Sequence, residues 1–293
     1  MHDLRGSGPA IDLESGQRQH AAMVMSLLML AAVATTPITC VPPKGAQALV
    51  SRGSLRWLLL GEDGHGTNEM PRTAADLVCA AIAAHRPVTV GVEFAFRNQS
   101  ALDAYLASDG GPAARAALLA APMWDPDRAD GKSSRAMLLL LEWLRLQHRG
   151  GLVSNVVAFD PDMIRDGADR EQQMARRLQA TAPAGNGLFI ALTGSYHAQI
   201  RLADAGTTPY PPMATLLPRA QTVSIRIQGS GGRNWSCTER GCGEQDANQT
   251  GGAERRLSLR ATPDGSYDGE YDLGIPVTPS PPVKQKKPGP DVP

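Results

Sequence analysis

Hydrophobic and polar positions alternate along the middle of the chain in the way that strands separated by helices do. Four short apolar runs, each stopped by a glycine or a polar residue, are typical of buried strands and cover 57–60, 88–94, 153–159 and 187–193. Between them, apolar residues at helical spacing predict helices over 71–86, 98–106, 113–121, 136–148 and 169–180. This order predicts an α/β domain over 49–228, with a mainly parallel sheet flanked by helices.

The pattern changes after this region. Residues 222–228 alternate between apolar and polar positions, which favours an edge or antiparallel strand. Residues 229–272 are rich in glycine, and we expect a small irregular or β segment appended to the main domain. Residues 273–293 are rich in proline and lysine and poor in apolar residues, which predicts a disordered tail.

Residues 1–48 form a predicted leader. The apolar run over 21–36 is shorter than the roughly 20 residues that a membrane-spanning helix needs, and it suits a secretory signal peptide. Cleavage would follow Ala48, or a lipid on Cys40 would attach the protein to a membrane. An uncleaved anchor or a buried helix is the alternative. We therefore expect an exported protein of the periplasm or cell envelope.

The four cysteines fit an exported protein. Cys40 belongs to the leader or carries a lipid, and Cys79 lies on a predicted helix as a core thiol. Cys237 and Cys242 bracket a turn-like spacer, which favours a local disulfide in an oxidising compartment. A zinc knuckle would require two more ligands, and none lies nearby in the sequence.

The charge and aromatic content of the chain limit which classes of binding partner and fold we expect. Lys plus Arg and Asp plus Glu both number 29, so no global positive field favours nucleic acid, and we expect a small-molecule or peptide substrate. Aromatic residues make up only 4% of the chain, which favours helices covering a sheet over an all-β sandwich.

Ionisable or imidazole groups follow the predicted strands. Because the carboxyl ends of parallel strands share one edge of a sheet, these groups are expected to line a cleft there; they are Glu62 and His65, Glu93, Asp160, and Tyr196 with His197. An imidazole beside a carboxylate can act as a general base on water. Alternatively, Glu62, His65 and His197 could bind zinc.

Each group also has a simpler explanation. His65 and His197 could cap a helix or form ordinary hydrogen bonds, Glu93 could pair with Arg97, and Asp160 could be a turn residue. Glu69 fits a carboxylate at the start of a helix better than a catalytic group. The coincidence of four polar strand ends favours a site.

The residues at these strand ends resemble a known superfamily. Gly61-Glu62-x-x-His65-Gly66-Thr67-x-Glu69, followed by a strand that carries Glu93, resembles the erythromycin esterase-like proteins. The helix with Arg170-x-x-x-Met174-Ala175, followed by a strand and Gly194-x-x-His197-Ala198, is similar to haem-binding ChaN-like lipoproteins and to the wider TraB and Tiki group. The resemblance covers about residues 55–220.

Each branch of this superfamily implies a different function. The esterase branch implies that His65 activates water with help from Glu62 and Glu93, and the Tiki branch implies that Glu62 and His197 bind the metal of a protease. The ChaN branch implies haem binding at the surface by a protein that need not be an enzyme. No haem ligand carries over from that branch, and Tyr196 or a histidine is the candidate in this sequence.

We expect an exported hydrolase that directs water, with or without a divalent metal, at an ester or amide. His65 would be the base, His197 a second base, acid or metal ligand, and Asp160 a further member of the site. A haem-uptake lipoprotein is the main alternative, and an envelope scaffold that binds partners through 229–293 is a third.

Overall fold

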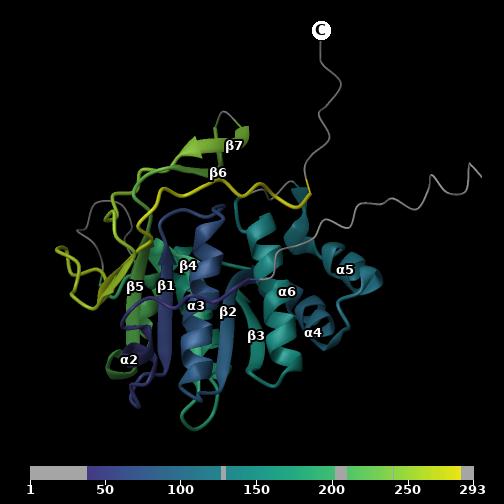
Figure 1. Ribbon diagram of the computed structural model, residues 1–293. Coiled ribbons are helices and arrows are strands. Elements are labelled where there is room, and N and C mark those ends of the chain that lie inside the picture. Colours follow the sequence, from purple (N-terminus) through teal and green to yellow (C-terminus); the bar gives the residue numbers. More distant parts are fainter. Residues whose placement is uncertain (1–37, 127–129, 202–209, 240, 285–293) are drawn as a thin grey trace, which may run out of the picture. The chain divides into compact units, whose positions relative to one another are not determined.

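The computed structural model describes residues 38–126, 130–201, 210–239 and 241–284. Within these residues, seven strands form one sheet in the order β3-β2-β4-β1-β5-β9-β8 (Figure 1). All neighbouring strands are parallel except β8 and β9, so the predicted α/β fold with a mainly parallel sheet is confirmed. The strands are β1 (Trp57–Glu62), β2 (Val88–Ala95), β3 (Val153–Asp160), β4 (Leu188–Gly194), β5 (Thr222–Gln228), β8 (Arg256–Ser258) and β9 (Gly269–Asp272).

Helices cover both faces of the sheet. They are α2 (Ala46–Val50), α3 (Glu69–Ala83), α4 (Gln99–Ala107), α5 (Pro112–Leu119), α6 (Arg135–Arg149), α7 (Gly167–Ala180) and α8 (Ser195–Ala198). Short 3₁₀ turns lie at Phe96–Asn98, Pro122–Trp124, Met213–Leu216 and Arg219–Gln221. None of the helices in the described part of the chain is long and apolar enough to cross a membrane.

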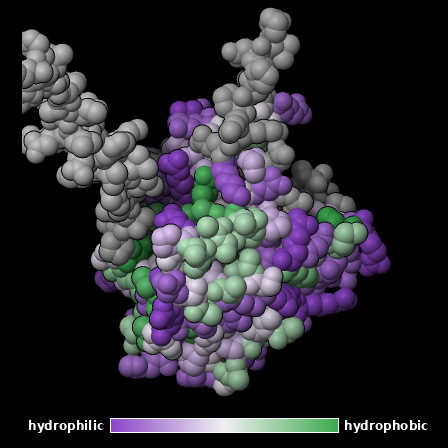
Figure 2. Space-filling model, turned by 90° about the vertical axis from the view of Figure 1, so that its right-hand side faces the viewer, coloured by the Kyte–Doolittle hydropathy of each residue, from purple (hydrophilic) through white to green (hydrophobic). Residues whose placement is uncertain are grey.

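The strands are apolar on both faces because both faces are buried. In β1, Leu58 and Leu60 pack in the core with α3, α4 and α6, whereas Trp57 and Leu59 pack in the core with α7. Figure 1 shows α3 and α6 in front of the sheet, and Figure 2 shows hydrophilic and weakly hydrophobic residues interspersed on the side where α4, α5 and α6 lie. The helices thus turn their apolar faces towards the sheet.

Strand β5 differs from its prediction. It pairs in parallel with β1 on one side and with β9 on the other, so the expectation of an edge or antiparallel strand is wrong. Its polar side chains have partners inside the fold: the Ser224 hydroxyl donates to the Ala198 carbonyl, and Arg226 donates to Asp63 at 2.7 Å. Alternating polarity therefore reflects internal hydrogen bonding here and not an exposed face.

The C-terminal region is joined to the main domain more closely than expected. Residues 229–272 supply β8 and β9 to the main sheet, and also β6 (Arg233–Thr238) and β7 (Gly241–Asp246), which form a separate antiparallel hairpin. The predicted disordered tail is wrong for 273–284, because Val277 and Ser280 are buried there and backbone bridges join Pro279 to Thr67 and Pro282 to Ser134. Residues 285–293 lie outside the described residues.

The N-terminal part of the described chain is also folded, although the leader was expected to reach residue 48. The expected cleavage sequence lies in α2, where Ala46 and Leu49 are fully buried. Cys40 forms a disulfide with Cys79, which corrects the expectation of a core thiol at Cys79. A Cys40 sulfur held in this bond has no thiol to carry a lipid. The apolar run over 21–36 lies outside the described residues.

The predicted disulfide between Cys237 and Cys242 is confirmed, and it links facing residues of β6 and β7. The described residues thus contain two disulfides. Such bonds persist in oxidising compartments and are rare in reducing ones, so they indicate an oxidising environment.

Candidate active site

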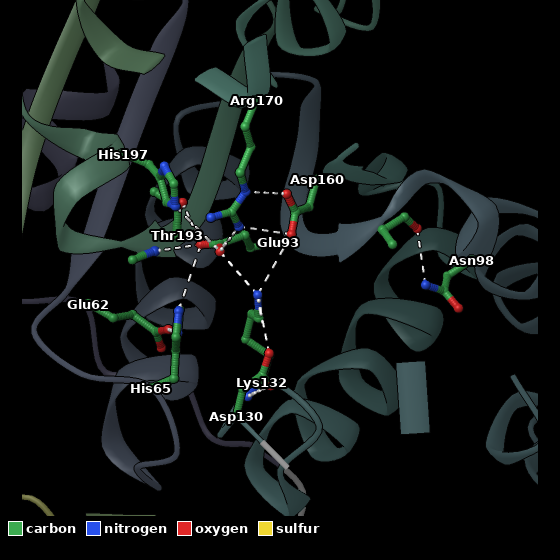
Figure 3. A network of polar contacts seen from close by, with 12 residues as sticks. Glu62, His65, Glu93, Asn98, Asp130, Lys132, Asp160, Arg170, Thr193 and His197 are labelled. Carbon is green, nitrogen blue, oxygen red and sulfur yellow. Dashed lines mark hydrogen bonds and ion pairs between the residues drawn. The ribbon is translucent and has the colours of Figure 1, made fainter. Parts of the chain in front are cut away.

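The carboxyl ends of β1 to β4 meet at one edge of the sheet and bring four predicted residues together. Glu62 ends β1, Glu93 lies near the end of β2, His65 lies in the loop after β1, and His197 lies in α8 directly after β4. Figure 3 shows Glu93 at the centre of this group, with the two imidazoles on one side and Lys132 and Arg170 beside it.

Glu93 is a buried carboxylate, and its side chain is only 4% exposed. Its Oε1 atom lies 3.3 Å from Lys132 Nζ and accepts a hydrogen bond from Arg170 Nη2 at 3.1 Å. Its Oε2 atom accepts hydrogen bonds from the Thr193 hydroxyl at 2.8 Å and the Gly194 N–H at 2.7 Å. The roughly four lone-pair positions of a carboxylate are therefore all used.

These contacts keep Glu93 ionised. Burial alone would raise its pKa, but the Lys132 ammonium, the His65 and His197 imidazoles and the Gly194 N–H outweigh that effect, and the pKa lies well below the ordinary value for glutamate. A negative charge is thus fixed at the centre of the site.

His65 forms the first imidazole–carboxylate pair. Its Nδ1 atom lies 2.5 Å from Glu62 Oε2, and its Nε2 atom lies 3.8 Å from Glu93 Oε2. Because an ionised carboxylate can only accept, Nδ1 carries the proton and Nε2 is the basic atom of the neutral ring. Burial would lower the pKa of His65, but the hydrogen bond and charge of Glu62 and the charge of Glu93 outweigh it and raise the pKa.

His197 forms a second pair of the same kind. Its Nδ1 atom lies 2.7 and 2.9 Å from the two carboxylate oxygens of Glu171, a residue of α7. Glu171 is itself held by the backbone N–H of Met213 at 2.7 Å. His197 Nε2 lies 3.7 Å from Glu93 Oε1, so both histidines turn the same ring nitrogen towards the same carboxylate.

The two cations at Glu93 have different surroundings. Arg170 is fixed to Asp160 by two parallel hydrogen bonds of 2.8 and 2.9 Å. Asp160 therefore reaches the site through Arg170, and it also lies 3.7 Å from Lys132 Nζ. Burial would lower the pKa of Lys132, but Glu93, Asp130 and Asp160 outweigh that effect and raise it, so Lys132 is protonated.

A small pocket opens to solvent beside these groups. Its polar lining includes Glu62, His65, Glu93 and Lys132, and its apolar lining includes Pro71, Phe94, Met137 and Leu192. A base and a fixed ammonium thus face one partly apolar space.

The arrangement fits a metal poorly. Glu62 binds the Nδ1 edge of His65, so Glu62 and the Nε2 atoms of His65 and His197 do not converge on one point. Glu93 has no lone pair left, and two cations already lie beside its Oε1 atom. Within the described ranges, no group of three or more His, Cys, Asp or Glu side chains is placed to hold a metal ion.

Other residues considered from the sequence have contacts outside this group. The Tyr196 hydroxyl donates to the Tyr210 carbonyl at 2.6 Å, and haem ligation by Tyr196 stays a prediction. Glu69 is the first residue of α3 and binds Thr278, while Asp63 pairs with Arg226. The alternative that Glu93 forms an ion pair with Arg97 is not observed, because Arg97 pairs with Asp162.

Sequence reasoning missed Lys132, Glu171 and Thr193. Lys132 comes from irregular chain before α6, where no periodicity indicates its position. Glu171 follows Arg170 on α7, and only the packing of α7 beside α8 shows that it meets His197. The one sequence signal for these residues was the position of the Glu171 carboxylate directly after Arg170, a residue of the motif shared with ChaN-like proteins.

No protein-family model matches the sequence, and no curated protein matches it. Solved structures do share its fold. A mutant of erythromycin esterase EreC in its open conformation aligns with a TM-score of 0.59 at 13% identity, over 81% of this chain and 94% of that chain. A succinoglycan biosynthesis protein aligns with a TM-score of 0.59 at 11% identity, over 81% of this chain and 91% of that chain. A protein from Bacillus cereus aligns with a TM-score of 0.54 at 12% identity, over 85% of this chain and 96% of that chain. At these identities the fold is shared, which confirms the fold implied by the resemblance.

Proposed function

We propose that this protein is a hydrolase that uses His65 to direct water at the carbonyl carbon of an ester or amide, in a small molecule or a peptide. One observation carries the proposal. His65 and His197 are each held by a glutamate at Nδ1, and both turn Nε2 towards the buried Glu93, next to an open pocket. The fold shared with an erythromycin esterase supports the same class of reaction.

The first step is proton transfer from water. His65 Nε2 accepts the proton while the water oxygen forms a bond to the carbonyl carbon, and the carbonyl electrons move to its oxygen. Glu62 keeps the imidazole in the required tautomer and stabilises the imidazolium that forms. Glu93 adds a second negative charge on the Nε2 side.

The second step breaks the bond to the leaving group. The oxyanion returns its electrons as the bond to the leaving group breaks, and the departing alkoxide or amine takes from the His65 imidazolium the proton that the water lost, which leaves His65 neutral again. The products are a carboxylic acid and an alcohol or amine. His197, backed by Glu171, is a second base or acid beside His65, because its Nε2 faces the other oxygen of the same carboxylate.

Lys132 is the group best placed to stabilise the oxyanion. It lines the pocket, its side chain is 20% exposed, and it is protonated. Arg170 carries the same charge, but it is fixed on Asp160. A preorganised positive charge aimed at a developing oxyanion is a large contribution to catalysis.

The proposed location is the periplasm or the cell envelope. Two disulfides support an oxidising compartment. Fractionation of cells that produce the full chain, followed by detection of the protein in each fraction, tests this location.

The test of function is a panel of ester and peptide substrates, assayed with and without a chelator. We expect activity that resists the chelator and that falls at least about 100-fold in His65→Asn and His197→Asn. His85→Asn is the matched control, because His85 is exposed and has a positive φ that asparagine accepts. Activity unchanged in both site variants would contradict the proposal, and so would a saturable Soret shift with added haem in a protein without hydrolytic activity.

A further inference from the structure

The loop that carries His65 is held by residues far away in the sequence. Glu62 is fixed in the sheet, but His65 lies three positions later, between Gly64 and Gly66, which both have positive φ. The backbone of this loop therefore needs support from outside the sheet. That support comes from the C-terminal region.

The hairpin of β6 and β7 supplies the first contacts. The Asn234 side chain donates to the His65 carbonyl at 3.2 Å, and the Trp235 N–H donates to the Gly66 carbonyl at 2.9 Å. Gly66 approaches so closely that a Cβ atom there would lie 2.1 Å from the Trp235 carbonyl oxygen. The fit between hairpin and loop is thus specific to glycine at this position.

The strand-like segment after β9 supplies the rest. The Gly66 carbonyl also accepts the Ser280 N–H at 2.8 Å, and the Asn68 N–H donates to the Thr278 carbonyl at 3.0 Å. The same segment joins the hairpin, because the Arg233 N–H donates to the Val277 carbonyl at 2.9 Å. Loop, hairpin and segment thus form one hydrogen-bonded unit.

The hairpin would be weak without its disulfide. An isolated two-stranded hairpin is marginally stable in water, and β6 and β7 contain few apolar residues. The bond between Cys237 and Cys242 closes its exposed end. It therefore maintains the strand register that places Asn234 and Trp235 against the loop.

We propose that the disulfide-linked hairpin of β6 and β7 positions His65 for catalysis, with Asn234 as the positioning residue. This inference rests on the proposed function of His65. The hairpin contributes no residue to the lining of the pocket beside His65, so it acts through the His65 backbone and not by substrate contact. Its effect falls on kcat, because a small displacement of a catalytic group slows the chemical step strongly.

The test compares two changes in the hairpin with two matched controls. Asn234→Ala removes the hydrogen bond to the loop, and Gln245→Ala removes an amide of similar size from its cross-strand neighbour. The double change Cys237→Ala/Cys242→Ala opens the hairpin disulfide, and Cys40→Ala/Cys79→Ala opens the other disulfide.

We expect kcat to fall about tenfold in Asn234→Ala and in the hairpin cysteine variant, with KM within about twofold and with both control variants near wild type. We also expect the pKa of His65 to fall in both hairpin variants. Its ring moves away from Glu62 and Glu93, which raise this pKa, while the nearby Lys132 ammonium lowers it. An NMR titration of the His65 ring in the full chain measures this shift without any substrate.

The outcomes separate this inference from the proposed function. Unchanged kcat and an unchanged His65 titration in both hairpin variants would overturn the positioning role. Losses that match the fraction of unfolded protein, measured by circular dichroism, would overturn it as well. If His65→Asn is fully active, the proposed function fails instead, whereas an inactive His65→Asn beside a fully active Asn234→Ala rejects the positioning role alone.

Discussion

His65 presents its Nε2 atom to Glu93 Oε2 at a distance of 3.8 Å, too long for a direct hydrogen bond. The charge of the buried carboxylate nevertheless acts on the ring, because the surroundings screen it poorly. Glu93 thus favours the protonated form of His65 and stabilises the imidazolium that proton abstraction creates. Several measurable consequences depend on this relationship.

The pH dependence of activity reports the state of His65. The base must be neutral, and its raised pKa keeps the ring protonated to higher pH than an ordinary histidine. The rate should therefore rise with pH and reach half its maximum above about 6.5, the ordinary value for histidine. A profile of kcat/KM between about pH 5 and 9 measures this midpoint.

Glu62→Gln should move that profile to lower pH. The change removes the hydrogen-bonded carboxylate that does most to raise the pKa of His65, so the pKa falls towards the ordinary value. The maximal rate should also fall, because the amide stabilises an imidazolium less well. Glu142→Gln is the control and should leave the midpoint unchanged, because Glu142 pairs with Arg115 and does not line the pocket.

Lys132→Met should lower kcat about 100-fold through loss of oxyanion stabilisation. It should also move the pH profile in the opposite direction, to higher pH, because Lys132 lowers the pKa of His65. Steady-state kinetics of this variant beside Lys44→Met, an exposed lysine, checks both effects. A profile shifted to lower pH would contradict the assigned electrostatics.

The two disulfides should stabilise the fold unequally. In the chain-entropy description a cross-link stabilises more when it closes a longer loop, and the separations are 39 residues for Cys40–Cys79 and 5 for Cys237–Cys242. Replacing both cysteines with alanine should lower the free energy of unfolding by about 4 kcal/mol for the first pair and about 2 kcal/mol for the second. Urea titration measures both values, and the reverse order would contradict the expectation.

Much of the α/β domain could be predicted because its signals are local. Apolar runs gave the strands and helical spacing gave the helices, and the shared edge of parallel strands brought Glu62, Glu93 and His197 together. Strand β5 was misread because Ser224 and Arg226 are polar yet bonded inside the fold. Local polarity alone does not reveal such partners.

The site residues that could not be predicted from the sequence are brought together only by tertiary packing. Glu171 meets His197 only through the placement of α7 beside α8, and Lys132 reaches Glu93 from irregular chain. The hairpin contact at His65 joins residues 169 positions apart. No spacing rule connects positions so distant.

The Gly66 carbonyl accepts two hydrogen bonds, so the His65 loop depends on residues that the ribosome adds late. Its two donors, Trp235 and Ser280, are synthesised long after β1. A nascent or truncated chain that ends before residue 280 leaves the Gly66 carbonyl without at least one of its two donors. The loop that carries His65 therefore gains its full set of anchors only after residue 280 has been added.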